Sequence, residues 1–98
     1  MLKFAYMQAS LLKQYKNIHE TIVKNVETIK MMVEQAKELQ TIAESIGKAG
    51  QMKTKEQLEQ QAAKMNKSIS DLIDQTTELF RLYDEFAEEI FGNQAAYG

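Results

Sequence analysis

Hydrophobic residues in the second half of the chain recur in alternating steps of four and three, from residue 58 to residue 90. This heptad spacing keeps one stripe of a helix facing a partner helix along its whole length. The pattern therefore predicts a helix over about residues 55–91 that packs against another helix. The stripe consists of Leu58, Ala62, Met65, Ile69, Leu72, Thr76, Leu79, Tyr83, Phe86 and Ile90.

From Ile69 onward this apolar face widens, because Ile73 and Phe80 lie beside the stripe. A wide apolar face is typical of a helix that contacts two neighbours rather than one. We hypothesise that the broad face of this helix buries against a second partner. That face consists of Ile73, Phe80, Tyr83, Phe86 and Ile90.

The first half of the chain predicts a helix over about residues 2–46 with two heptad registers, which meet at a stutter where two steps of four follow each other. The upstream register is Phe4, Leu11, Tyr15, Ile18 and Ile22. The downstream register is Ile22, Val26, Ile29, Val33, Ala36, Leu39, Ile42 and Ile46. Asn17 and Glu20 have the spacing of a capping box, so a break near Lys16 fits the sequence equally well.

Residues 47–53 predict the turn between the helices, because Gly47 and Gly50 lie close together only here. Gly47 suits the left-handed position after a helix, and Thr54 with Gln57 forms a capping box for the next one. Residues 92–98 are expected to be a frayed tail. The sequence thus predicts one all-α domain over residues 1–98: an antiparallel hairpin of long helices, or a three-helix bundle if the first ~15 residues fold back.

Aromatic and charged residues support the antiparallel arrangement. The four phenylalanines and four tyrosines all lie near the chain ends, with none between residues 16 and 79. Residues 1–19 hold three lysines and no acid, whereas residues 71–98 hold seven acids and only Arg81. A hairpin brings these segments together, where the aromatic residues serve either as internal core or as a docking patch. The candidate interaction residues are Phe4, Tyr15, Ile73, Phe80, Tyr83, Phe86, Ile90 and Phe91.

A single seam between two helices buries less apolar surface than the ordering of 98 residues requires. We therefore expect self-association, docking onto other protein subunits, or both. No run approaches the ~20 apolar residues that span a bilayer, so no membrane span is expected. The amphipathic start of the chain fits packing on the second helix better than attachment to a membrane surface.

Composition removes several classes of function. The chain has no cysteine, which excludes disulfides and Cys-based zinc sites. A net charge of −2 argues against a general nucleic-acid binder. His19 is the only histidine, and no phosphate loop or Ser–His–Asp set is present. We expect no catalytic activity, no metal or other cofactor, and no small-molecule substrate.

Three segments carry a resemblance to a known group of proteins. They are Tyr6-Met7-Gln8 with Leu12-Lys13-Gln14-Tyr15, the run from Ile29 to Leu39, and the run from Leu72 to Phe80 with Tyr83-Asp84-Glu85-Phe86. With the turn Ser45 to Gly50, they resemble the type IV secretion minor pilins and the conjugal-transfer TrbJ proteins over residues 4–92. The resemblance implies a structural subunit of a bacterial secretion or DNA-transfer pilus, in the periplasm, the cell envelope or the extracellular space.

Two other classes share the helical plan. One is the small secreted WXG-type hairpin, although Ile46-Gly47 stands here where that class has tryptophan at the turn. The other is a coiled-coil adaptor or chaperone, which implies a cytoplasmic location. All three readings agree on a protein that acts by helix assembly and not by catalysis.

Overall fold

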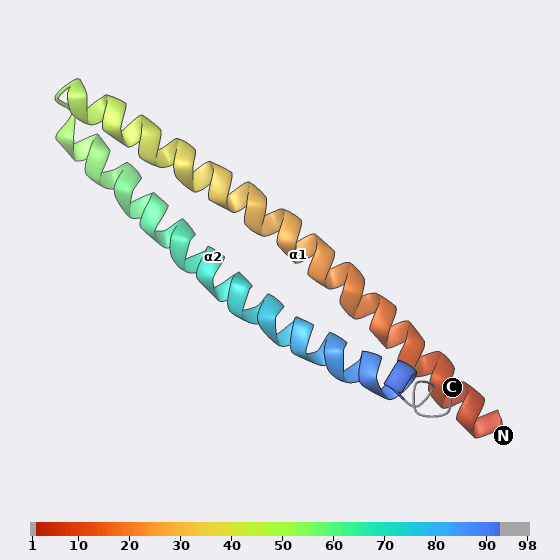
Figure 1. Ribbon diagram of the computed structural model, residues 1–98. Coiled ribbons are helices and arrows are strands. Elements are labelled where there is room, and N and C mark those ends of the chain that lie inside the picture. Colours follow the sequence, from red (N-terminus) through yellow and green to blue (C-terminus); the bar gives the residue numbers. More distant parts are fainter. Residues whose placement is uncertain (1, 93–98) are drawn as a thin grey trace. The chain divides into compact units, whose positions relative to one another are not determined.

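The computed structural model describes residues 2–92, with side chains from residue 5 onward. Two helices, α1 (Leu2–Lys48) and α2 (Met52–Ala87), are followed by a short π-helix, η1 (Glu88–Gly92), and residues 2–92 contain no strand. The helices run antiparallel on either side of a tight turn, which confirms the all-α helical hairpin (Figure 1).

α1 continues through Lys16, so neither the break nor the third helix occurs in the described residues. No proline or glycine precedes Gly47, and nothing in the backbone therefore interrupts the helix. The carbonyl of Asn17 stays inside the helix and accepts a hydrogen bond of 2.9 Å from the hydroxyl of Thr21. The capping-box spacing at Asn17 is thus not used to start a helix.

The turn is shorter than the sequence predicted, and its left-handed residue is Gly50 rather than Gly47. Gly50 has a φ of +87°, while Gly47 belongs to α1. The amide of Gln51 donates to the carbonyl of Ile46 at 3.1 Å, and that of Gly50 donates to Gly47 at 3.0 Å. These two bonds form a Schellman motif, which satisfies the last carbonyls of a helix with one left-handed residue.

α2 begins at Met52, three residues before the predicted start. The carbonyl of Gln51 accepts a hydrogen bond of 3.1 Å from the amide of Lys55, so Gln51 holds the N-cap position that the sequence assigned to Thr54. Gln51 therefore closes α1 with its amide and opens α2 with its carbonyl. This double role removes the need for a longer connection.

The chain contacts divide the structure into two compact units. The terminal unit pairs residues 2–25 of α1 with residues 75–92, and the turn unit comprises residues 26–74. The division in α1 falls next to the predicted stutter at Ile18, Ile22 and Val26. Ile22 is buried, and Ile18 and Val26 are half-buried, so both registers of α1 face α2.

The α2 stripe is confirmed as the packing face, because every one of its ten residues is buried or half-buried. The fully buried positions of the described chain are few and mostly small. They are Ile22, Ala36, Ala43, Ala62, Ile69 and Thr76. Small residues let two helix backbones approach closely, but they withdraw little apolar area from water.

One seam residue of α1 was predicted wrongly. Ile42 is 47% exposed, whereas Ala43 is 1% exposed and occupies the seam. The step of four from Leu39 leads to Ala43, so helical geometry selects the small residue over the larger apolar neighbour.

The described helices include none that is both long and apolar enough to cross a membrane.

The Schellman motif predicts that Gly50→Ala destabilises the hairpin, because a left-handed residue with a Cβ costs roughly 1–2 kcal/mol. Thermal or urea denaturation followed by circular dichroism measures the loss. The matched control is Gly47→Ala, where φ is helical and the new Cβ meets only the flexible side chain of Lys55 at 2.7 Å. Equal stability of the two variants would contradict the role of Gly50.

Candidate interaction surface

The structure brings together the aromatic residues of the two chain ends within the terminal unit. The rings of Tyr15 and Tyr83 stack with centroids 4.4 Å apart and planes 19° from parallel. The hydroxyl of Tyr15 donates a hydrogen bond of 2.5 Å to that of Tyr83. Phe91 meets Tyr15 edge-on at 5.7 Å. Offset stacking and edge contacts are the favoured geometries for aromatic pairs, so this cluster holds α1 against the end of α2 and against η1.

The pKa of Tyr15 is raised above its ordinary value of 10.0. The largest cause is the hydrogen bond with Tyr83, followed by desolvation and by the negative charges that Tyr83 and Asp84 carry when ionised. Each of these causes disfavours the phenolate. The neutral form of Tyr15 is therefore the form that the folded terminal unit stabilises.

An open hollow of about 330 Å³ lies beside this tyrosine pair. It is lined by Tyr15, Lys16, His19, Glu20 and Tyr83. The imidazole of His19 is tilted by 38° against the ring of Tyr83, with centroids 5.9 Å apart. His19 is thus a neighbour of the aromatic cluster, although its side chain is exposed.

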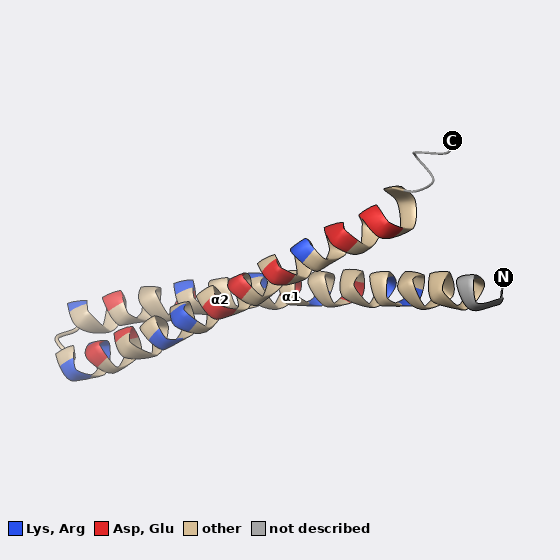
Figure 2. Cartoon of the chain, turned by 90° about the horizontal axis from the view of Figure 1, so that it is seen from below, with Lys and Arg blue, Asp and Glu red and all other residues tan. Residues whose placement is uncertain are grey.

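The acidic end of α2 carries one compact ion-pair network. Arg81 donates from Nε and Nη2 to Oε2 of Glu78 at 3.2 and 3.1 Å, and from Nη1 to Oε1 of Glu85 at 2.6 Å. The hydrogen bond with Glu78, with the charges of both glutamates, raises the pKa of Arg81. The single cation therefore neutralises part of a surface that is otherwise acidic (Figure 2).

The predicted interaction residues separate into two groups. Tyr15, Tyr83, Phe86 and Ile90 are half-buried, and Phe91 contacts Tyr15 although it is 46% exposed. Phe80 in the terminal unit is 48% exposed, and Ile73 in the turn unit is 46% exposed. Phe4 lies in α1, and its side chain is outside the described part of the structure. Much of the predicted set thus contributes to packing inside the hairpin, while Ile73 and Phe80 keep large apolar surfaces in solvent.

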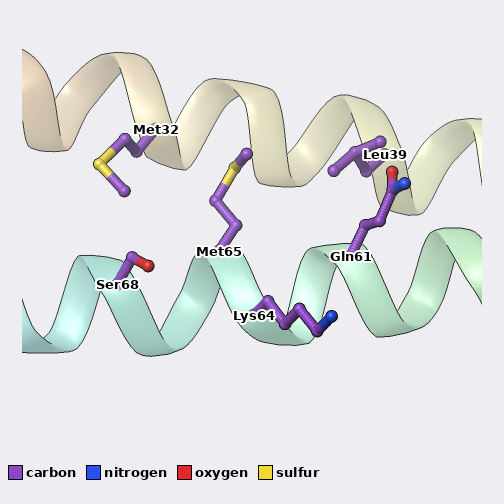
Figure 3. A pocket seen from close by; sticks show the side chains of 6 residues that line it. All are labelled: Met32, Leu39, Gln61, Lys64, Met65 and Ser68. Atoms are coloured by element: carbon purple, nitrogen blue, oxygen red, sulfur yellow. The ribbon is translucent and has the colours of Figure 1, made fainter.

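A second hollow, of about 350 Å³, lies between the helices of the turn unit (Figure 3). Met65 extends from α2 toward α1, between Met32 and Leu39 (Figure 3). Gln61, Lys64 and Ser68 complete the lining. This groove was not among the features predicted from the sequence. The sequence nevertheless contains a signal for the groove. Three of its lining residues, Met32, Gln61 and Ser68, each directly precede a seam position.

Within residues 2–92, no cluster of three or more His, Cys, Asp or Glu side chains has the geometry to hold a metal ion. Every buried side-chain nitrogen or oxygen in that part has a hydrogen-bond partner. The prediction that the protein is not an enzyme stays a prediction.

The chain matches no protein-family model, no curated protein and no solved structure.

The raised pKa of Tyr15 predicts how stability changes at alkaline pH. A raised pKa means that the stabilisation is complete below pH about 10 and is lost as the pH rises through the folded-state pKa. Tyr15→Phe keeps the ring but removes the hydroxyl, so stability should decline less between pH 9 and 11. Denaturation at a series of pH values measures the difference, and Tyr6→Phe, at a residue 74% exposed, is the control. Identical alkaline profiles for the two variants would exclude this coupling.

Proposed function

We propose that this protein is a non-enzymatic structural subunit that acts by helical assembly, with itself or with other protein subunits. The observation that carries the proposal is the small core of the hairpin. Among the described residues, four of the six buried positions are alanine or threonine, and large residues such as Phe80 remain about half exposed. Folding of such a pair leaves apolar surface that another helix would remove from water.

The exposed area supports the same proposal. The chain exposes 7841 Å², whereas a compact monomer of 11.3 kDa exposes roughly 5,700 Å² by the usual scaling with mass. The excess is larger than the area that one partner contributes to a standard protein interface, which is about 800 Å². Obligate assemblies commonly bury this much surface, because their subunits share one core.

The resemblance to type IV secretion minor pilins and conjugal-transfer TrbJ proteins suggests a setting for this assembly. We propose a bacterial secretion or conjugation apparatus at the cell envelope, where the chain would contact other pilus components. The support is the helix–turn–helix order and the segments within residues 4–92 that resemble those proteins. Fractionation of the native cells tests this location, and a purely cytoplasmic protein would favour an adaptor or chaperone instead.

The assembly proposal predicts a solution mass above 11.3 kDa. Light scattering after size exclusion, at low and high protein concentration and at two salt concentrations, measures it. We expect a dimer or larger species whose fraction grows with concentration, because apolar surface drives the association. A helical monomer of 11.3 kDa under every condition would contradict self-association.

A further inference from the structure

The terminal unit has one flank on which both helices carry exposed apolar side chains. Four residues directly follow the seam positions from Leu11 to Ile22 of α1 in this unit: Leu12, Lys16, His19 and Val23. Leu12 is 39% exposed and Val23 is 43% exposed. Steps of four, three and four place all four residues on one stripe of the helix.

The matching stripe of α2 follows the same rule. Its residues are Thr77, Phe80, Asp84 and Ala87, each directly after a seam position. Phe80 is 48% exposed, and Ala87 is half-buried. In the turn unit, residues that directly precede seam positions on α1 and on α2 line the same hollow. Residues with the same offset from the seam on the two helices therefore lie on the same side of the seam. The two stripes therefore form one face of the terminal unit, which we call the apolar flank.

Two comparisons within α1 show that its part of this flank is unusual. On α1 of the turn unit, the first four residues that follow the seam are charged and exposed: Glu27, Lys30, Glu34 and Lys37. On the opposite side of α1 in the terminal unit, the residues that precede the seam are all polar and exposed: Ser10, Gln14, Asn17 and Thr21. Neither of these surfaces needs a covering partner, whereas the apolar flank does.

Each helix contributes one fully charged residue to the apolar flank, and the two charges are opposite. Lys16 follows Tyr15, and Asp84 follows Tyr83, and the two tyrosine rings stack. In antiparallel helices these two residues are then offset by only about 3 Å along the helix direction. One positively charged and one negatively charged residue therefore lie side by side on the same face.

We propose that the apolar flank is a self-association surface whose occupant is the same flank of a second copy, related by a two-fold axis parallel to the helices. This rests on the proposed function and specifies its partner. With such an axis, α1 of one copy lies against α2 of the other, and all neighbouring helices are antiparallel as in a four-helix bundle. Lys16 then faces Asp84 of the second copy, and Asp84 faces its Lys16.

The charge distribution selects this arrangement over the alternative. An axis perpendicular to the helices would place α1 against α1, so that Lys16 would approach lysine-rich α1 of the other copy. The parallel axis instead sets Lys16 of each copy against Asp84 of the other, so both symmetry-related contacts join opposite charges. Opposite charges around an apolar centre favour the self-complementary contact of a two-fold dimer.

Charge reversal in separate chains tests the proposal. Lys16→Asp alone and Asp84→Lys alone each place like charges at both symmetry-related contacts, so each should weaken self-association by about tenfold or more. When the two variants are mixed in equal amounts, both contacts between unlike chains again join an aspartate to a lysine. The mixture should therefore restore a dimer that contains one chain of each kind. Sedimentation velocity with one variant fluorescently labelled measures both effects.

The mixture separates contacts between chains from contacts within one chain. A charge effect inside the hairpin is the same whether the other variant is present or not, whereas a contact between copies recovers on mixing. Lys13→Asp and Glu89→Lys are the matched controls, since they change the net charge equally and lie outside the flank. They should weaken association less than the flank variants do.

A second pair of variants tests the apolar part of the face. Phe80→Ser should weaken self-association by about tenfold or more, because its apolar ring is removed from the centre of the contact. Ile42→Ser is the control, since Ile42 is 47% exposed but lies in the turn unit. Circular dichroism confirms that both variants remain helical.

The outcomes separate the two proposals. Weakening by the flank variants, with recovery on mixing, supports the flank dimer. Self-association that survives Phe80→Ser, or does not recover on mixing, overturns the flank dimer and leaves assembly as the proposed function. A wild-type chain that stays at 11.3 kDa overturns the flank dimer and self-association, and leaves assembly with other protein subunits as the proposed function.

Discussion

The packing of α1 against α2 along one seam is the interaction on which the rest of the structure depends. Half of its most buried positions are alanines, and the others are Ile22, Ile69 and Thr76. Small residues bring the helices close, but dispersion and burial then act over a limited area. Larger apolar residues lie at the margins of the seam. The hairpin therefore combines a core of small residues with exposed apolar surfaces on its flanks.

The two ends of the hairpin are held by different kinds of contact. At the turn, a Schellman motif with Gly50 closes α1 and starts α2 within three residues. In the terminal unit, stacked Tyr15 and Tyr83 replace small seam residues with rings that share a hydrogen bond. Aromatic rings bury much area at low cost in side-chain entropy, so they suit an end of the hairpin that no covalent turn constrains.

Most of the fold was predictable because heptad periodicity reports directly which stripe of a helix is buried. The α2 seam was correct at every position, and the antiparallel direction followed from the aromatic and charged ends. The errors were local. Ile42 is more hydrophobic than Ala43 but is out of phase with the seam. The starts of α2 and of the turn differ from the prediction because one residue, Gln51, serves both helices.

The sequence by itself determined that this chain forms two long antiparallel helices with an apolar seam, since periodicity and the absence of proline depend only on the order of residues. It did not determine which aromatic residues are internal. Only the tertiary structure showed that Tyr15 and Tyr83 pack against each other while Phe80 stays in solvent. The reason is physical: both kinds of residue lie on one wide apolar face, and the rotation of α2 against α1 decides which part of it is covered.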